Sequence, residues 1–379
     1  MRGCKKEQLN IAMFGHKRIP SREGGVEVVV QALSTRMAKL GHHVTCYNRG
    51  GRPVCGPGRD GRISDSYEGV RLKTVWTLDK KGLAAVTSSF FAALRAAVGN
   101  ADVVHIHGEG PAFMCWLPKL FGKRVVVTVH GLDWQRKKWA NGFGAKYILA
   151  GEKMAARLAD AIIVLSRSAQ QYFQRTYGRE TVWIPNGVCK PECRAPEEIG
   201  RQFGLNKDGY ILYLGRLVPE KGAHYLIEAF SGVRTDKKLV IAGGTSDTPD
   251  YGEMLKTMAK GDARILFTGF IQGRILEELY SNAYVYVLPS ELEGMPLSLL
   301  EAMSYGNCCL VSDIPECTEV VEDKAAVFAK NNVVDLRNWL QKFCDDPSLT
   351  GEWKAYSQSY ICGKYNWEAV TQKTMELYR

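Results

Sequence analysis

The sequence lacks any long apolar segment. Its longest apolar runs, such as Val125-Val126-Val127, have the length of a strand, whereas a membrane-spanning helix needs about 20 predominantly apolar residues. Residues 1–6 are basic, but no apolar segment follows them. We therefore expect neither a transmembrane helix nor a signal peptide.

Two common cysteine and glycine patterns are also missing. The eleven cysteines include no Cys-x-x-Cys pair. Because their number is odd and the chain is long, we expect reduced thiols and a cytoplasmic location. Cys189 and Cys193 have no second pair of ligands nearby, which argues against zinc. The Gly-x-Gly-x-x-Gly fingerprint is absent after the first predicted strand, which argues against a nicotinamide enzyme.

Formal charge is divided unevenly along the chain. Residues 1–190 hold 30 Lys and Arg against 13 Asp and Glu, a charge of +17, whereas residues 191–379 hold 20 against 27, a charge of −7. A basic half indicates an anionic partner, such as a phospholipid surface, nucleic acid or a phosphorylated molecule. The alternative is that these residues only solvate the surface. No interleaved aromatic and basic module is present, so we expect no nucleic-acid partner. The basic segment 135–139 is a candidate contact with an anionic membrane, or an ordinary exposed loop.

Strand-like and helix-like segments alternate along nearly the whole chain. In the first half, the predicted strands are residues 9–14, 43–47, 70–75, 103–106, 124–129, 161–165 and 181–184, and the predicted helices are residues 26–40, 83–98, 111–121, 143–158 and 167–177. After a polar, proline-bearing linker at 186–196, the predicted strands are residues 210–214, 239–242, 265–268, 284–288 and 308–311, and the predicted helices are residues 219–230, 252–259, 274–281 and 297–305, with a helical tail from 333.

This alternation predicts an α/β protein with two doubly wound, Rossmann-like domains. We place them at residues 1–190 and 191–365, with a last helix at 366–379. Ligands of such sheets bind at the carboxyl ends of the strands, so a cleft between the two domains is the expected site.

The stretch from Ser290 to Met303 carries two carboxylates at a strand-to-helix turn. Glu293 precedes the predicted helix and Glu301 lies in its second turn, so the two can reach one ligand from different directions. The unpaired amides of the first helical turn also favour an anion. Acceptors for hydroxyls beside donors for phosphates suit a sugar nucleotide. The alternative is two solvated glutamates on a surface helix.

A second turn carries two cations. Gly215 and Arg216 follow a predicted strand, and Lys221 lies in the next predicted helical turn, which begins with Pro219. A guanidinium can fork onto two phosphate oxygens, and an ammonium adds a point charge. The segment therefore predicts a diphosphate clamp, with two solvated cations as the alternative.

Histidines end two predicted strands of the first half. His130 follows residues 124–129, and His105 and His107 stand in similar positions on the preceding strand. Any of them can bind a hydroxyl or a phosphate, and position alone does not choose among them. No Asp-x-Asp follows a strand; the nearest pattern is Glu291-Leu292-Glu293. We therefore expect no metal and no other cofactor.

These motifs together resemble the retaining family-4 glycosyltransferases with the GT-B fold. The resemblance rests on Glu293 and Glu301 with seven residues between them, on Gly215-Arg216 with Glu220-Lys221-Gly222, on Gly24-Gly25-Val26-Glu27 and on Val129-His130-Gly131. Four motifs in this order cover nearly the whole chain. The segments Phe14-Gly15-His16-Lys17-Arg18-Ile19-Pro20 and His130-Gly131-Leu132-Asp133-Trp134 resemble the subgroup with rhamnosyltransferases of surface polysaccharide assembly.

The resemblance implies roles in the second domain. Glu301 would take the ribose hydroxyls of the nucleotide and Glu293 a hydroxyl of the donor sugar. Arg216 and Lys221 would neutralise the diphosphate as it leaves. The nucleobase would lie near the turn that ends at Ile271.

Other implied contacts come from helix starts and from the first domain. Gly24 and Gly25 would approach the phosphates, and His130 the donor sugar near its reacting carbon. The family often has glycine where this chain has Pro296, and proline has no amide to donate. The amides of Leu297 and Ser298 remain.

The resemblance also implies a reaction. Such an enzyme moves a sugar from a nucleotide-diphosphate donor to an acceptor, here a glycan or a lipid-linked acceptor, by a same-face displacement that keeps the anomeric configuration. The last helix would couple the two domains. Two alternatives stay open: a nucleotide-sugar epimerase of the same fold, and a non-catalytic nucleotide-sugar binder.

Overall fold

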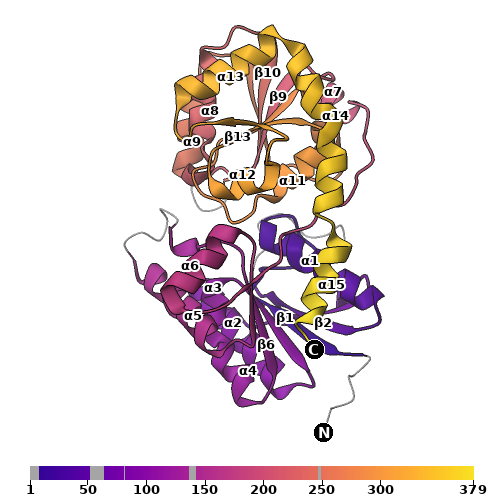
Figure 1. Cartoon of the computed structure of the whole chain (residues 1–379), viewed down its shortest axis with the longest axis vertical. Coiled ribbons are helices and arrows are strands. Elements are labelled where there is room, and N and C mark those ends of the chain that lie inside the picture. The colour runs from indigo at the N-terminus through magenta and orange to yellow at the C-terminus, as the bar shows by residue number, and fades with distance from the viewer. Residues whose placement is uncertain (1–7, 52–63, 81, 136–141, 246–248) are drawn as a thin grey trace. The chain divides into compact units, whose positions relative to one another are not determined.

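The chain divides into two compact units, each built around its own sheet. The computed structural model describes residues 8–51, 64–80, 82–135, 142–245 and 249–379. Unit 1 comprises residues 1–186 and 367–379, and unit 2 comprises residues 187–366 (Figure 1). Both sheets are parallel apart from one short edge strand. The predicted fold class, two Rossmann-like α/β domains, is confirmed.

The sheet of unit 1 has the strand order β3-β4-β2-β1-β5-β6-β7-β8. Its strands are β1 (Asn10–Phe14), β2 (His43–Arg49), β3 (Ser66–Tyr67), β4 (Val70–Val75), β5 (Val103–His107), β6 (Arg124–Val129), β7 (Ala161–Val164) and β8 (Val182–Trp183). Only β3 runs antiparallel to its neighbour, β4. The apolar strands are buried on both faces, as parallel strands covered by helices must be.

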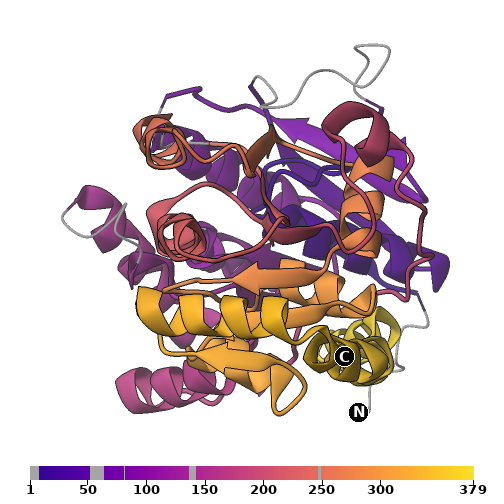
Figure 2. The same cartoon turned by 90° about the horizontal axis from the view of Figure 1, so that it is seen from above.

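Helices cover both faces of this sheet (Figure 1). They are α1 (Gly25–Lys39), α2 (Leu83–Val98), α3 (Glu109–Ala112), α4 (Trp116–Leu120), α5 (Phe143–Leu158), α6 (Arg167–Tyr177) and α15 (Trp367–Glu376), with 3-10 turns η1 (Phe113–Cys115) and η2 (Asp133–Gln135). Along β6, Val125 and Val127 belong to the apolar core shared with α2, α5 and α6. Helix α15 packs beside α1 and carries the C-terminal end of the chain (Figure 2).

Helix α15 is fastened to unit 1 by polar contacts at both of its ends. Glu368 accepts a hydrogen bond from Arg36 Nε at 3.0 Å. Just beyond the helix, the Tyr378 hydroxyl lies 2.5 Å from His105 Nδ1 in the middle of the sheet. The C-terminal helix therefore belongs structurally to unit 1.

Unit 2 has a six-stranded parallel sheet in the order β11-β10-β9-β12-β13-β14. Its strands are β9 (Tyr210–Leu214), β10 (Lys238–Ala242), β11 (Ile265–Gly269), β12 (Val285–Leu288), β13 (Cys308–Ser312) and β14 (Ala326–Phe328). Its helices are α7 (Glu198–Phe203), α8 (Ala223–Ser231), α9 (Pro249–Met258), α10 (Arg274–Asn282), α11 (Leu297–Ser304), α12 (Pro315–Val321), α13 (Val333–Asp345) and α14 (Pro347–Lys364), with the 3-10 turn η4 (Pro219–Lys221). One core cluster joins Leu226, Leu255 and Leu340, from α8, α9 and α13, to Tyr213 and Val285 of the sheet.

Two helix predictions are wrong in detail. The expected helix at residues 219–230 is a 3-10 turn, η4, followed by α8, because Gly222 has a left-handed backbone with φ of 69° that interrupts a right-handed helix. The expected helix at residues 111–121 is divided into α3, η1 and α4. The sequence analysis also missed β3, α7, α12 and β14, which are short.

Candidate functional site

Two turns of unit 2 are bound together at the carboxyl ends of β9 and β12. The amide of Glu291 donates to the carbonyl of Glu220 at 2.8 Å. A Cβ on Gly222 would lie only 1.9 Å from the carbonyl oxygen of Pro289, so the two backbones touch at a position that only glycine fits. This close approach places η4 directly against the segment that follows β12.

Two predicted site residues meet at this junction. Lys221 Nζ lies 2.5 Å from Glu293 Oε1, and the same carboxylate oxygen accepts from Ser290 Oγ at 2.7 Å. The Lys221 side chain is 18% exposed and that of Glu293 6% exposed. The alternative of two solvated groups is therefore wrong for these two residues, since they form a largely buried ion pair.

The other predicted cation lies at the end of β9. The amide of Gly215 donates to Ala242 at 3.0 Å, and a Cβ on Gly243 would lie 1.8 Å from the carbonyl oxygen of Gly215, so the ends of β9 and β10 also touch. Arg216 follows and is partly exposed, and its guanidinium makes no ion pair with any residue that the structure describes. Its carbonyl accepts from the Tyr213 hydroxyl at 3.1 Å, which fixes the backbone of this turn. Arg216 is thus a cation available to an anionic ligand.

Helix α11 begins at the predicted turn. Pro296 is its N-cap with extended backbone, and its carbonyl accepts from Leu299 at 3.1 Å and from Leu300 at 3.3 Å. Within the described chain, the amides of Leu297 and Ser298 have no backbone acceptor. These first-turn donors are the groups that bind anions at helix N-termini.

Tyrosines hold the polar side chains of α11. The Tyr286 hydroxyl, from the centre of the sheet, donates to Ser298 Oγ at 2.8 Å, and the Tyr280 hydroxyl, from α10, donates to Glu301 Oε2 at 3.1 Å. Glu301 is partly exposed. Burial raises the pKa of Tyr286 well above its usual value, so this tyrosine acts as a neutral donor.

The remaining predicted residue of unit 2 lies farther along the same sheet edge. Ile271 is two residues beyond β11, and β10 separates this strand from β9. The structure therefore joins Lys221 to Glu293 directly and places Ile271 two strands from Gly215.

The two predicted glycines of unit 1 begin α1. Gly24 has extended backbone and precedes the first helical residue, Gly25. A Cβ on Gly24 would lie 2.5 Å from Glu27 Oε2, while Glu27 Oε1 accepts from the amide of Lys17 at 2.7 Å. Gly24 therefore makes room for a buried carboxylate in the first turn, where a negative charge is favoured.

The histidines of unit 1 have different surroundings. His105 is fully buried between Tyr378 and Thr128, whose Oγ1 lies 2.7 Å from His105 Nε2. His107 is also buried, and its Nδ1 lies 3.1 Å from Nε2 of His130. Of the three, only His130 is partly exposed. The structure thus distinguishes the predicted residue from its two neighbours, which position alone did not.

Burial changes the protonation of these residues. It lowers the pKa of His130 to about 4 and that of His105 to about 3, and it lowers the pKa of His107 well below its usual value. All three are therefore neutral imidazoles at pH 7.

An acidic residue that was not predicted as a site residue, Glu109, lies beside them. Glu109 begins α3 two residues after His107, and its Oε2 accepts from the amide of Asp133 at 2.8 Å. Burial, with Glu152 nearby, raises the pKa of Glu109 to about 11, so the carboxyl group is neutral at pH 7. Glu109 therefore ties the start of α3 to the turn after His130. The only sequence signal was its place just after a predicted strand.

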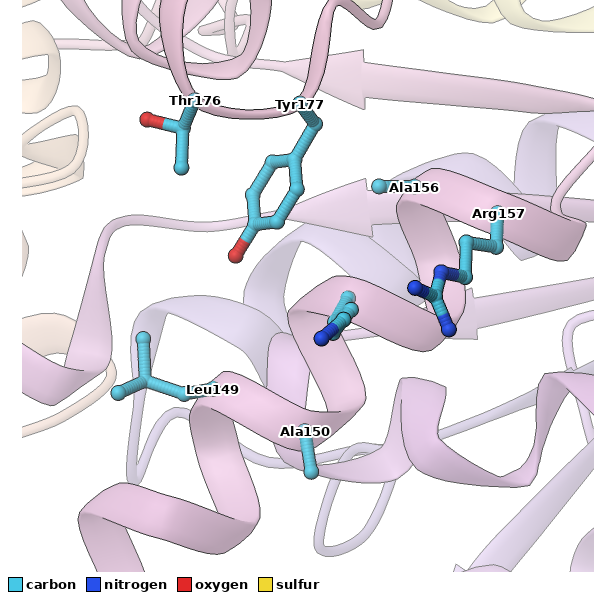
Figure 3. A pocket seen from close by; sticks show the side chains of 7 residues that line it. Leu149, Ala150, Ala156, Arg157, Thr176 and Tyr177 are labelled. Carbon is cyan, nitrogen blue, oxygen red and sulfur yellow. The ribbon is translucent and has the colours of Figure 1, made fainter.

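A cavity of about 620 Å³ lies elsewhere, between α5 and α6 (Figure 3). Its lining is Leu149, Ala150, Lys153, Ala156, Arg157, Thr176 and Tyr177. None of the predicted site residues lines it. Its two cations are exposed, and its buried polar neighbour, Glu152, already accepts from Tyr177 at 2.5 Å. We therefore do not take this cavity as the site.

In the described part of the chain, no three His, Cys, Asp or Glu side chains are grouped so that they could hold a metal ion. No helix among the described residues is both long and apolar enough to span a membrane. The predicted membrane contact at 135–139 lies outside the described residues except for Gln135.

Comparisons with known proteins agree with this architecture. Residues 23–189 match the family model Glycosyltransferase Family 4, and residues 196–360 match Glycosyl transferases group 1. A glycosyltransferase of Methanocaldococcus jannaschii is 26% identical over 402 residues, with 98% of each chain covered. The chain is therefore a GT-B glycosyltransferase with a family 4 N-terminal domain and a group 1 C-terminal domain.

Solved structures share the fold over the whole chain. Sucrose-phosphate synthase from Thermosynechococcus elongatus superposes with a TM-score of 0.83 at 22% identity, covering 98% of both chains. Anabaena HepE in complex with UDP and glucose gives a TM-score of 0.79 at 17% identity, covering 97% of this chain and 98% of HepE.

Proposed function

We propose that this glycosyltransferase moves a hexosyl or deoxyhexosyl unit from a nucleotide-diphosphate donor to a glycan or lipid-linked acceptor, with retention and without a metal. The observation that carries the proposal is the pair of joined turns in unit 2. They gather Arg216, Lys221, Glu293 and the open amides of α11 at one sheet edge. The binding of UDP and glucose by HepE, which has the same fold, supports a nucleotide-sugar donor.

The ion pair suggests how a donor would be received. Lys221 and Glu293 satisfy each other at 2.5 Å. A diphosphate would attract the ammonium, and a sugar hydroxyl would donate to the carboxylate, so both charges would keep a partner when the donor binds. Arg216 has no competing ion pair among the described residues and would bind the phosphates without giving up a contact.

The chemistry follows from these charges. As the bond between the anomeric carbon and the phosphate oxygen breaks, negative charge collects on the diphosphate, and Arg216 with Lys221 stabilises it. The acceptor oxygen attacks from the same face, forms the new glycosidic bond and gives its proton to the departing phosphate. Glu301 would hold the ribose hydroxyls, the segment at Ile271 the base, and Gly25 and His130 would approach from unit 1.

The acceptor and cellular context are further parts of the proposal. The basic first half fits an acceptor carrying phosphate at an anionic membrane surface, and the resemblance to rhamnosyltransferases fits surface polysaccharide or glycolipid synthesis. Equal binding of the protein to neutral and anionic vesicles would contradict the membrane part and leave the transfer reaction untouched.

A nucleotide panel tests the donor. A matched nucleoside diphosphate should stabilise the protein by about 2.7 kcal/mol at a concentration of 100 Kd, which a thermal shift detects. Arg216→Ala should abolish most of this shift and lower kcat about 100-fold or more. The control is Arg201→Ala, since Arg201 is exposed and, in the described part of the chain, pairs only with Glu198 of its own helix; this variant should behave as wild type. If both variants keep full activity, the proposed site is wrong.

Labelled donor separates the alternatives. Slow hydrolysis of donor alone and transfer to acceptor support the proposal, whereas interconversion of two sugar nucleotides without acceptor would identify an epimerase. Nucleotide binding with no turnover of any donor would identify a binder.

A further inference from the structure

The inference concerns the hydrogen bond between two histidines of unit 1. His107 ends β5 and pairs in register with Thr128 of β6, and His130 lies two residues beyond Thr128. Residues two apart on a strand point to the same side, so His107 and His130 face each other. Their rings stack at 5.3 Å between centroids with 29° between planes, and His107 Nδ1 lies 3.1 Å from His130 Nε2.

Packing holds the His107 ring in place. A Cβ on Gly15 would lie 2.1 Å from the carbonyl oxygen of His107, so the turn after β1 packs closely against the backbone of His107. The His105 ring lies 4.1 Å away between centroids and is itself bound to Thr128 and Tyr378. His107 therefore presents Nδ1 to His130 from a fixed position.

The two rings allow only two arrangements of protons. Both imidazoles are neutral because burial lowers the pKa of each, so each carries one N–H, and one proton lies between Nδ1 and Nε2. Either His107 donates and His130 carries its own proton on Nδ1, or His130 donates and His107 carries its proton on Nε2.

The surroundings of His107 favour the first arrangement. His107 Nε2 is buried without a hydrogen-bond partner among the described residues. In the second arrangement this atom would be a buried N–H with no acceptor, and such orphaned donors are rare in native proteins, whereas a bare acceptor is met more often. The first arrangement leaves only a lone pair there.

We propose that His107 is a positioning residue that keeps the proton of His130 on Nδ1, so that His130 offers its ligand an N–H donor. A donor of this kind suits a sugar oxygen, and a ring that already carries its proton on Nδ1 cannot serve as a base through that atom. The identity of the ligand as the donor sugar rests on the proposed function, whereas the tautomer does not.

The direct test is nitrogen NMR of the full-length protein labelled with ¹⁵N-histidine, in which protonated and bare ring nitrogens have distinct shifts. The His130 signals are assigned by their loss in His130→Gln. We expect His130 to be protonated on Nδ1 at pH 7. Protonation on Nε2 in the wild-type protein would overturn the proposal, and this measurement needs neither a variant at position 107 nor a substrate.

Kinetics supply the second test. His107→Asn can keep a donor near the position of Nδ1, whereas His107→Leu removes it, and losing such a supporting contact costs about 10- to 100-fold. We expect His107→Leu to lower kcat by at least about tenfold, with nucleotide thermal shifts unchanged, and His107→Asn to restore most of the rate. Equal rates for wild type and a folded His107→Leu would refute the positioning role. If no donor is turned over by wild type, the proposed function fails while the tautomer result stands.

Discussion

The ion pair between Lys221 and Glu293 allows a quantitative test of how the site is built. Lys221→Met removes the ammonium and, among the described residues, leaves the Glu293 carboxylate with only the Ser290 hydroxyl as a side-chain donor. Glu293→Gln removes the negative charge and keeps a side chain of the same shape. The Glu293 side chain is 6% exposed and the Lys221 side chain 18% exposed. Because Lys221→Met leaves the more buried charge without its counterion, it should be the more damaging change.

The magnitude follows from burial. Breaking a fully buried pair costs about 3 to 5 kcal/mol, whereas exposed pairs contribute roughly 0.2 to 1 kcal/mol. This pair is closer to the buried limit, so we expect about 2 to 4 kcal/mol for Lys221→Met and a coupling energy of about 1 to 3 kcal/mol in the double-mutant cycle. For a domain of this size, that loss lowers the Tm of unit 2 by roughly 4 to 16 °C.

The assay is thermal and urea unfolding of wild type, both single variants and the double variant. The control cycle uses Lys256 and Glu253, a pair in the same unit with side chains 59% and 73% exposed. Its coupling should stay below about 0.5 kcal/mol. A coupling as small as this for Lys221 and Glu293 would refute our view that the pair is buried.

The double variant also separates stability from function. Removing both charges relieves the unpaired carboxylate, so stability should recover towards wild type. Transfer should not recover, because the diphosphate and the sugar have then lost their partners. A stable double variant with full activity would show that the pair only supports the fold.

Three further predictions concern the backbone and protonation. Gly222→Ala should lower the unfolding temperature of unit 2 by more than Gly204→Ala, since both glycines of this unit have positive φ but only at Gly222 would a Cβ meet a carbonyl, at 1.9 Å; equal Tm values would contradict the close approach. Stability should fall as the pH drops below about 6.5, because burial lowers the pKa of His105 to about 3 and of His130 to about 4 and only the unfolded chain then binds these protons; a Tm that is flat from pH 7 to pH 5 in wild type would argue against buried neutral rings. Glu109→Gln should gain stability over wild type as the pH rises from 5 to 8, because burial raises the pKa of Glu109 to about 11 and the native state must hold a proton that the unfolded chain releases; a gain that does not grow with pH would contradict a neutral Glu109.

The backbone of the site was largely predictable from sequence. Alternating apolar runs set the strands, and Gly306, with φ of 79°, follows the end of α11 as a glycine after a helix should. The carboxyl ends of parallel strands lie at one edge of a sheet, so Arg216, Glu293 and Glu301 could be assigned to one edge of unit 2 before any coordinates were known.

The contacts between these residues were not predictable, because they depend on how separate turns meet. The sequence predicts Lys221 in the first turn of a longer helix, but the left-handed Gly222 ends the 3-10 turn there and itself approaches Pro289. That contact, at a separation of 67 residues in the chain, brings Lys221 to Glu293. A tyrosine in a buried strand, such as Tyr286, indicates a hydrogen bond, because a buried hydroxyl requires a partner. The sequence did not identify that partner.

The two units carry different polar groups at the carboxyl ends of their strands. Unit 2 offers ions, Arg216 with the Lys221 and Glu293 pair, which suit a diphosphate leaving group. Unit 1 offers neutral groups, with His130 uncharged at pH 7, and the charge of Arg49 at the end of β2 is opposed by Glu27. Exposed cations such as Lys153 and Arg157 on α5 carry part of the +17 charge of residues 1–190. Exposed charges of this kind attract an anionic partner over a broad surface, and salt screens this attraction. We therefore expect added salt to weaken the capture of an anionic acceptor, seen as a higher KM, more than it lowers kcat at saturating acceptor; a salt effect on kcat alone would place the decisive charges at the reacting phosphate instead.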